Sequence, residues 1–226
     1  MSFEGFPPAT SVFLAGLTEN NSKAWFDAHR PEYEQHYLEP AKAFATSMQG
    51  QFAKFAPGIT AEPRVNGSIF RINRDVRFSK DKTPYKNHLD IWIYEGGDRK
   101  SGFSGFFFRM YADSVILGSG IHGFEKEELG KFRQAVDGET SGKALAAVLN
   151  KLAGGGYETG GGHYKKMPRG FAADHPCGDL LRHNALYAHT EVALPSEARA
   201  KAFSTWCGGH FKKLLLLHEW LLGNVR

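Results

Sequence analysis

Six cationic side chains crowd into sixteen residues near the middle of the chain, and only two acidic residues accompany them. The cations are Arg71, Arg74, Arg77, Lys80, Lys82 and Lys86, and the acids are Asp75 and Asp81. The chain carries 28 Lys and Arg against 24 Asp and Glu, a net charge of +4, so the other 22 basic and 22 acidic residues cancel. Such a local excess indicates a site for an anion rather than a generally basic surface.

The types of these side chains suit phosphate or carboxylate groups. An arginine recognises such a group through two parallel N–H donors, whereas a lysine acts as a point charge. We expect Arg71, Arg74 and Arg77 to hold the anion, the three lysines to line the rim, and the two aspartates to orient the arginines. In an extended strand, Arg71 and Arg77 would lie about 20 Å apart. This spacing favours a polyanion, a ligand with separated anionic groups, or a cluster that other segments complete.

Further residues are predicted to complete an Arg/Lys-rich cleft. Lys166 and Arg169 form a second basic group that would clamp the anion from the other side, with a surface loop as the alternative, and Arg30 would approach from the N-terminal helices. The predicted ligand-binding set is Arg71, Asn73, Arg74, Asp75, Arg77, Lys80, Lys82, Tyr85, Lys86, Lys166, Arg169 and Arg30. The alternative for the whole stretch is a solvated sheet face with Arg–Asp pairs, each contributing less than about 1 kcal/mol.

Apolar and polar residues alternate over 69–78, which predicts a strand with two distinct faces. The apolar face would carry Phe70, Ile72, Val76 and Phe78, and the polar face Arg71, Asn73, Asp75 and Arg77. Arg74 breaks this alternation, because its position places a guanidinium among apolar residues. Either a bulge re-aims the chain, or a carboxylate or ligand holds Arg74.

Proton transfer has few candidates near this stretch. Asp75 lies between cations, which should lower its pKa and make it a poor general base. His88 is the better candidate, on a strand whose polar face would also hold Asp90, and Asp81 and His175 are weaker catalytic candidates. Convergence of His88, His122, His163 and His175 is the remaining metal alternative, but no HExxH motif or Cys/His quartet is present. We therefore expect no metal and no cofactor.

The periodicity of apolar residues predicts an α+β fold, an antiparallel β-meander packed against N-terminal and C-terminal helices in a single domain over 1–226. Short connections between the strands favour antiparallel neighbours. Helices are expected at 10–18, around Trp25, and from Pro31 to Phe52 with a kink at Pro40. The predicted later elements are strands at 69–78, 88–94, 102–111 and 114–120, helices at 124–136, 141–152 and 176–183, a strand at 185–193 and a helix from about 196.

Composition excludes several classes of protein. Hydrophobic residues make up 42% of the chain, which is enough for a core, but no window reaches the length of a membrane span. The N-terminus lacks the features of a signal peptide. Cys177 and Cys207 cannot form a disulfide framework, so a cytoplasmic location is expected. The glycines of 154–162 match neither a P-loop nor a dinucleotide fingerprint and are interpreted as a mobile loop or lid.

The sequence also resembles a widespread, mainly bacterial uncharacterised family, classed as a domain of unknown function. The resemblance covers nearly the whole chain. Its most specific motif is the block from Arg71 to Lys86, which follows the pattern RxNRDxRFSKDKxPYK. The other matching residues are Gly5-Phe6-Pro7, Phe13-Leu14, Leu17, Asn20-Asn21, Trp25-Phe26, Arg30, Tyr33, Lys166-Met-Pro-Arg-Gly-Phe171 and Asp174-His175-Pro176. One departure is that the stretch 154–162 is longer than the family pattern. The resemblance implies a site at the basic block but no activity, substrate or catalytic residue.

Three classes of function remain on these residues. The leading hypothesis is binding of a phosphate- or carboxylate-bearing ligand, an anionic small molecule, in the Arg/Lys-rich cleft. A phosphoester hydrolase or transferase is the first alternative, in which arginines would stabilise transition-state charge. A nucleic-acid or protein-interaction module is the second, because aromatic residues are interleaved with the cations. No membrane partner is expected.

Overall fold

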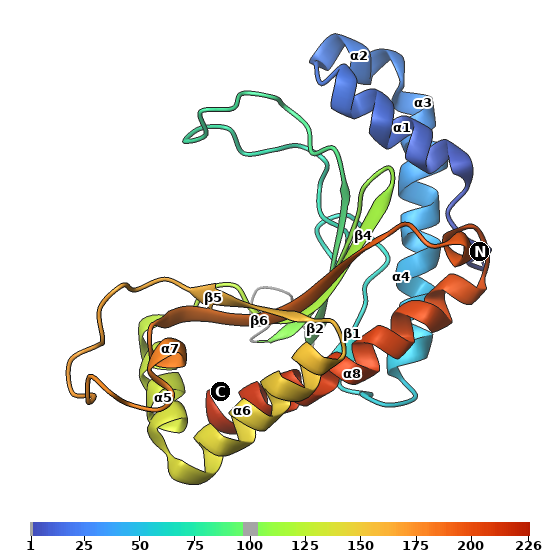
Figure 1. Ribbon diagram of the computed structural model, residues 1–226. Helices are drawn as coiled ribbons and strands as arrows, with labels where there is room; N and C mark the ends of the chain where they lie inside the picture. The colour runs from blue at the N-terminus through green and yellow to red at the C-terminus, as the bar shows by residue number, and fades with distance from the viewer. Residues whose placement is uncertain (1, 97–103) are drawn as a thin grey trace. The chain divides into compact units, whose positions relative to one another are not determined.

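The computed structural model describes residues 2–96 and 104–226, which form an α+β fold, as the sequence predicts (Figure 1). The chain begins with helices, and Ser22 starts the second of them by accepting a hydrogen bond from the Trp25 N–H. The N-terminal elements are α1 (Pro8–Glu19), α2 (Lys23–Ala28), α3 (Arg30–Glu32), a π-helical turn η1 (Tyr33–Leu38) and α4 (Glu39–Phe52). The predicted helix from Pro31 to Phe52 is therefore one continuous run with a π-helical start.

The described residues form a six-stranded antiparallel sheet with the order β1-β2-β3-β4-β6-β5. The first four strands follow one another as a meander, and β5 pairs with β6 at the edge, with Glu158 opposite His189. The strands are β1 (Ile59–Thr60), β2 (Leu89–Glu95), β3 (Gly105–Met110), β4 (Ser114–Ile121), β5 (Glu158–Gly162) and β6 (His183–Ala193). The predicted strands at 88–94, 114–120 and 185–193 are confirmed, and so is the described part of 102–111.

Helices return after the meander, also as predicted. A capping box between Glu125 and Glu128 starts the first of them, because each side chain bonds the backbone of the other residue. These elements are α5 (Lys126–Asp137), α6 (Glu139–Gly154), α7 (Gly178–Leu181), the 3-10 turn η2 (Ser196–Arg199) and α8 (Ala202–Asn224). Within the described residues, every helix is too short or too polar to cross a lipid bilayer.

The chain divides into two compact units, each built from three separate stretches of sequence. Of the described residues, unit 1 comprises 2–96, 107–117 and 191–210, and unit 2 comprises 104–106, 118–190 and 211–226. Strands β3, β4 and β6 each contribute residues to both units. The expectation of a single domain stays a prediction, and the two units are described separately below.

Unit 1 has an aromatic core. Phe6, Phe44, Phe108 and Phe203 are at most 1% exposed, and the centroids of the Phe44 and Phe108 rings lie 4.6 Å apart. Phe203 meets Phe44 and Phe108 with centroid distances of 5.8 and 6.0 Å. Aromatic side chains bury large apolar areas and favour such tilted contacts. This cluster joins the N-terminal segment, α4, β3 and the start of α8.

The π-helical turn has a local chemical cause. In an α-helix the N–H of residue 40 would bond the carbonyl of His36, but Pro40 has no N–H. The buried hydroxyl of Thr10, on α1, donates a hydrogen bond to the His36 carbonyl. The irregular turn and Pro40 are thus accommodated by a side chain from another helix, which also ties α1 to the start of α4.

In unit 2, the glycine-rich stretch ends in a strand and is not the loop that we expected. Residues Glu158–Gly162 form β5, in which a Cβ on Gly160 would lie 2.3 Å from the ring of Tyr187 on β6. Gly161 has φ +116°, a conformation that side chains rarely adopt. The glycines are needed because an aromatic ring and the backbone of β6 cross the strand closely.

The bond from Thr10 gives a first prediction. Thr10→Val keeps the shape of the side chain but leaves the His36 carbonyl without this donor, so we expect unit 1 to lose about 1–2 kcal/mol of unfolding free energy. Thr46→Val is the matched control, because the Thr46 hydroxyl bonds the Lys42 carbonyl on an exposed part of α4. Urea unfolding measures both variants, and equal losses would contradict the role given to Thr10.

Candidate functional site

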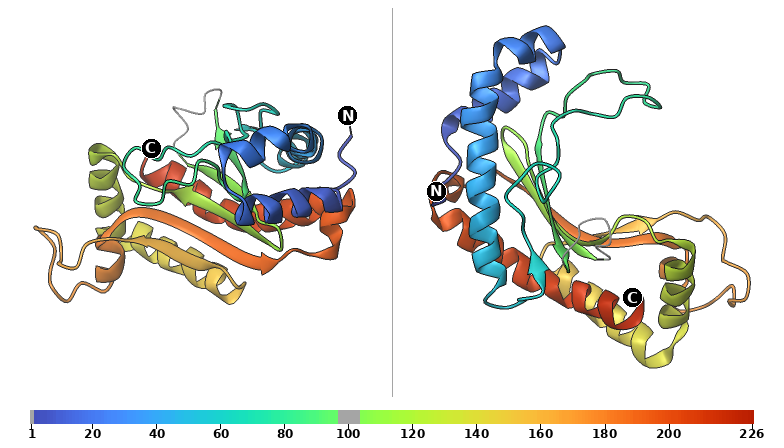
Figure 2. Two further views of the ribbon diagram at one scale, coloured as in Figure 1. Left: turned by 90° about the horizontal axis from the view of Figure 1, so that it is seen from above. Right: turned by 180° about the vertical axis from the view of Figure 1, so that it is seen from behind.

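The basic segment, residues 71–86, is not the strand predicted over 69–78. Within residues 69–86, all of which are described, there are only isolated bridges: Ile69 pairs with Val65 and Ile91, and Asn73 pairs with Tyr85. The Arg74 N–H bonds the carbonyl of Pro84, but Pro84 has no N–H to return, so the ladder stops there. Residues 74–84 form a loop that projects beyond the N-terminal end of β2, drawn in teal to green in Figure 1 and in the right view of Figure 2.

Arg74 closes this loop from the inside. Its guanidinium donates hydrogen bonds to the Asp81 carboxylate at 2.5 Å, to the Thr83 carbonyl at 3.0 Å and to the Thr83 hydroxyl. Hydrogen bonds from the Thr83 backbone and hydroxyl, and then from Arg74, lower the pKa of Asp81 below its ordinary value. The irregular position of Arg74 is thus explained by a carboxylate, one of the two explanations expected from the sequence.

The outer part of the loop carries a second arginine–aspartate pair and an exposed aromatic ring. Arg77 donates from Nε and Nη2 to Asp75 at 3.0 and 2.7 Å. This bond lowers the pKa of Asp75, in the direction expected. Phe78, predicted to face the core, is instead 96% exposed, and the Arg77 guanidinium lies 5.8 Å from its ring centroid. Lys82 bonds the carbonyl of Val76.

Two cations of the segment form no salt bridge within the described residues, although one of them, Arg71, attracts Asp75 at longer range. Arg71 and Lys80 are exposed, and within the described part of the chain neither side chain makes a hydrogen bond or a salt bridge. Asn73, also in the predicted set, is exposed as well. The segment therefore keeps positive charge at its surface after its own aspartates have been used.

The base of the loop is fastened to the N-terminal helices through Tyr85. The side-chain amide of Asn21 both donates to the Tyr85 carbonyl at 2.8 Å and accepts from the Tyr85 N–H at 3.0 Å. The Tyr85 ring stacks on Phe26 with a centroid distance of 4.3 Å. The Arg30 guanidinium lies over the Phe26 ring, 5.4 Å from its centroid, and Arg30 also pairs with Asp27. The predicted residues Arg30 and Tyr85 thus belong to this fastening.

The inner end of the segment joins a buried carboxylate on β2. Asp90 is 9% exposed and accepts from Lys86 at 3.1 Å, from His88 Nε2 at 3.2 Å, and from Arg109 Nε and Nη2 at 2.6 and 3.3 Å. We call Lys86, His88, Asp90 and Arg109 the Asp90 cluster. The strand face that carries Asp90 was expected to extend the site, but it is largely covered, because β2 is mostly buried on both faces.

Arg109 was missed from the sequence, although a signal was present. It is a single charge in the apolar strand β3, and Asp90 is the one charge in the interior of the apolar strand β2, whose other acid is its last residue, Glu95. Because β2 and β3 are neighbours, two isolated opposite charges on them are expected to pair. Burial alone would raise the pKa of Asp90, but the bonds from His88 and Arg109 hold it well below its ordinary range.

His88 is held on both sides of its ring. Nε2 faces Asp90, and Nδ1 lies 3.1 Å from the side-chain oxygen of Asn87. The buried Tyr37 hydroxyl donates to the His88 carbonyl. His88 is therefore a fixed member of the Asp90 cluster. Neither of its ring nitrogens can exchange a proton with a ligand unless the side chain moves.

The other predicted site residues lie in unit 2. Lys166 and Arg169 are exposed. His175 accepts at Nδ1 from the Cys177 N–H, so its proton is on Nε2, which lies 3.2 Å from Asp137. The clamp expected from Lys166 and Arg169 stays a prediction. Among the described residues, no three His, Cys, Asp or Glu side chains gather as metal ligands, and this applies to the four histidines considered above.

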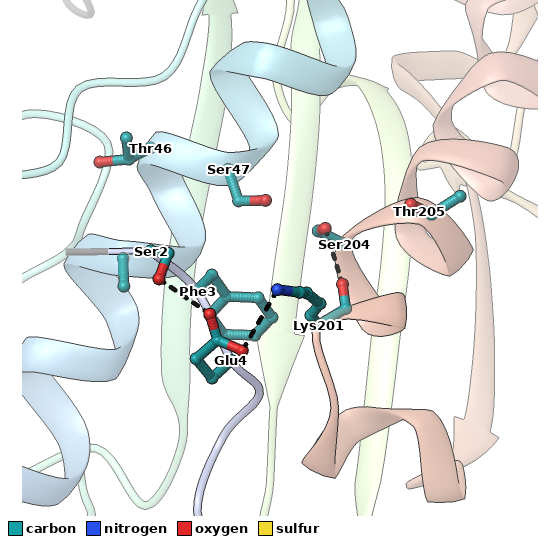
Figure 3. Close-up of a pocket in the computed structure, with 9 residues that line it drawn as sticks. Ser2, Phe3, Glu4, Thr46, Ser47, Lys201, Ser204 and Thr205 are labelled. Atoms are coloured by element: carbon teal, nitrogen blue, oxygen red, sulfur yellow. Dashed lines mark hydrogen bonds and ion pairs between the residues drawn. The ribbon is translucent and has the colours of Figure 1, made fainter.

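Unit 1 also contains a pocket of about 380 Å³ away from the predicted residues (Figure 3). It lies between the N-terminal segment, α4 and the start of α8. Ser2 donates to Glu4 at 2.8 Å, and Glu4 lies 3.6 Å from Lys201. The charged groups of this pocket neutralise each other, so it offers less to an anion than the basic segment does. Its lining residues are Ser2, Phe3, Glu4, Ala43, Thr46, Ser47, Lys201, Ser204 and Thr205.

Comparison with known proteins gives a family and no activity. The family model described as "Conserved hypothetical protein (DUF2461)" matches residues 9–220, so the chain belongs to this family. This confirms the resemblance to an uncharacterised family. No curated protein and no solved structure matches the chain significantly.

The lowered pKa of Asp90 gives a prediction about acid stability. Because the folded pKa lies below the unfolded value of about 3.9, the carboxylate stabilises the fold above that pH, and this contribution is lost as the pH falls below it. We expect Asp90→Asn to cost about 3 kcal/mol of unfolding free energy near neutral pH, with the difference from wild type shrinking below about pH 4. Chemical unfolding between pH 2 and 7 measures it.

Asp75→Asn is the control for this experiment, since it removes an exposed carboxylate whose pKa is also lowered. Exposed ion pairs contribute little, so we expect a change of less than about 1 kcal/mol. A constant difference between Asp90→Asn and wild type at every pH would contradict the assignment.

Proposed function

We propose that this member of the DUF2461 family binds a phosphate- or carboxylate-bearing ligand on the basic segment of unit 1. The observation that carries the proposal is the unequal use of charge: Asp75 and Asp81 bond Arg77 and Arg74, while Arg71 and Lys80 form no salt bridge within the described residues, and Arg71 attracts Asp75 only at longer range. Like charges crowded on a short loop repel one another. An anion placed among them would relieve this repulsion.

The aspartates support binding by orienting donors. A guanidinium has five N–H groups, and Asp75 occupies two of those on Arg77. The remaining donors are thus held in a defined direction before any ligand arrives. The hydrogen bonds of Arg74 order the loop as a whole, because they link residue 74 to residues 81 and 83. Such preorganisation lowers the entropic cost of binding.

The cations do not share one role, which refines the first hypothesis. Arg74 and Lys86 are bonded to Asp81 and Asp90, whereas Arg71, Arg77, Lys80 and Lys82 are exposed along the basic segment. Residues spread along a projecting loop suit a ligand whose negative charges are also spread. We therefore favour a polyanion over a single small anion gripped by three arginines.

A second candidate function, a phosphoester hydrolase or transferase, is favoured by the Asp90 cluster. Lys86 and Arg109 place two cations on one carboxylate, with His88 beside them. Arginine and lysine can stabilise charge that develops on a transferred phosphoryl group. We rank this function second because both ring nitrogens of His88 already face protein oxygens.

The proposal also includes a cytoplasmic location, as expected from the sequence. Two free cysteines support it, because a reducing compartment keeps thiols unpaired.

Removal of the two unpaired cations tests the proposal. We expect Arg71→Gln/Lys80→Gln to weaken binding of inorganic polyphosphate at least about fivefold, equivalent to about 1 kcal/mol, because both charges face solvent. Arg74→Ala is less suitable, since that change also opens the loop. Isothermal titration at low and moderate salt measures the affinity, with orthophosphate and sulfate as small anions.

The matched control is Lys151→Gln/Lys212→Gln, which removes the same net charge from exposed sites outside the segment. Equal weakening in both double variants would mean that polyphosphate responds only to net charge. That result, or no binding to wild type, would refute the proposed site.

A further inference from the structure

The exposed ring of Phe78 lies among the cations of the proposed site. Single exposed apolar side chains are common on protein surfaces, but Phe78 is 96% exposed, more than any other large hydrophobic side chain of the described residues, and it lies on a loop rich in cations. Its neighbours Arg77 and Lys80 are also exposed. Phosphate and carboxylate groups do not stack on an aromatic ring, so a purely ionic ligand would leave the Phe78 ring without a contact.

We infer that the ligand of the basic segment is a single-stranded nucleic acid, whose phosphates contact the exposed cations and one of whose bases stacks on Phe78. This inference rests on the proposed function and names its ligand class. Proteins that bind single strands without reading sequence combine a basic track along the backbone with aromatic rings on which bases stack. The loop supplies both features within six residues, Arg77 to Lys82.

The local geometry leaves one face of the ring for a base. The Arg77 guanidinium lies 5.8 Å from the centroid of the Phe78 ring, and it is itself fixed by Asp75. A guanidinium over one face of an aromatic ring is attracted by the ring quadrupole, which helps to hold the ring in place. The same guanidinium retains N–H donors that a neighbouring phosphate can accept from.

The irregular shape of the segment also favours a flexible strand over a duplex. The bases of a duplex are stacked on each other and present only their edges, so an exposed ring gains no stacking partner there. In a single strand each base can leave its neighbours and cover a ring. Cations at positions 71, 77, 80 and 82 then meet successive phosphates instead of one group.

An anionic membrane is the competing occupant, and the loop suits it less. Phe78 is the one large apolar side chain in the described residues 71–86 that is exposed, so insertion would rest on a single ring. Asp75 and Asp81 stand on either side of it and would approach the lipid headgroups with it. A base stacks on the ring without burying the polar backbone of the loop.

The test compares Phe78→Ala with wild type on two polyanions, a fluorescent mixed-sequence single-stranded oligonucleotide and inorganic polyphosphate of similar charge. We expect Phe78→Ala to weaken oligonucleotide binding by about 5- to 100-fold and to leave polyphosphate binding unchanged. Phe78→Trp should retain oligonucleotide binding, with quenching of the added tryptophan. Tyr164→Ala, which removes an exposed aromatic ring in unit 2, is the matched control.

The outcomes separate the two proposals. If polyphosphate binds but the oligonucleotide binds no tighter and Phe78→Ala changes nothing, the nucleic-acid inference is overturned while the proposed function stands. If neither polyanion binds, both fail. If Phe78→Ala abolishes binding to vesicles of phosphatidylcholine and phosphatidylserine and the oligonucleotide does not bind, the occupant is a membrane and the inference is overturned.

Discussion

Unit 1 depends on the burial of one carboxylate. An ionised Asp90 inside a sheet is costly unless cations and hydrogen bonds surround it. Lys86 and Arg109 meet this requirement, and in doing so they attach the end of the basic segment to β2 and β3. From this fixed point the chain runs back through Tyr85, which Asn21 holds on the N-terminal side. The projecting loop can be exposed because its base is anchored twice.

The acidic residues in the basic segment and at its base on β2 therefore have one role in common. Asp81, Asp75 and Asp90 each take up an arginine, and together they fix the base, the interior and the outer part of the loop. The cations outnumber these acids, so the same interactions that order the loop leave it with positive charge. Structure and proposed function thus arise from one property of the sequence, its local charge excess.

Most of the fold could be predicted from periodicity alone, since apolar residues at helical or strand spacing mark the core-facing side of each element. The helices before and after the meander and the strands β2, β4 and β6 were found in this way. The segment 69–78 was misassigned because alternation says nothing about ladder partners. Pro84 lacks the N–H that a ladder needs, and the Arg74 side chain bonds Asp81 and Thr83 in place of a neighbouring strand.

The contacts within the candidate site were predicted in part. The errors in that prediction have the same origin as the error over residues 69–78, because they too depend on which strands pair. The pairing of aspartates with arginines followed from charge and short separation. The exposure of Phe78 could not be foreseen, because it depends on where the ladder stops. Arg109 is distant in sequence from Asp90, so only the pairing of β2 with β3 brings the two together. The glycines of β5 were interpreted as a loop because the ring of Tyr187 that requires them lies on another strand.

The central claim is that the basic segment of unit 1 is the anion-binding surface. NMR titration of the labelled protein with polyphosphate tests it most directly, by following the backbone amides and the arginine Nε–H signals. The account predicts saturable shifts confined to residues 71–86 and to the Nε–H groups of Arg71 and Arg77. Shifts centred on the pocket beside Glu4 and Lys201, or none at saturating ligand, would contradict it.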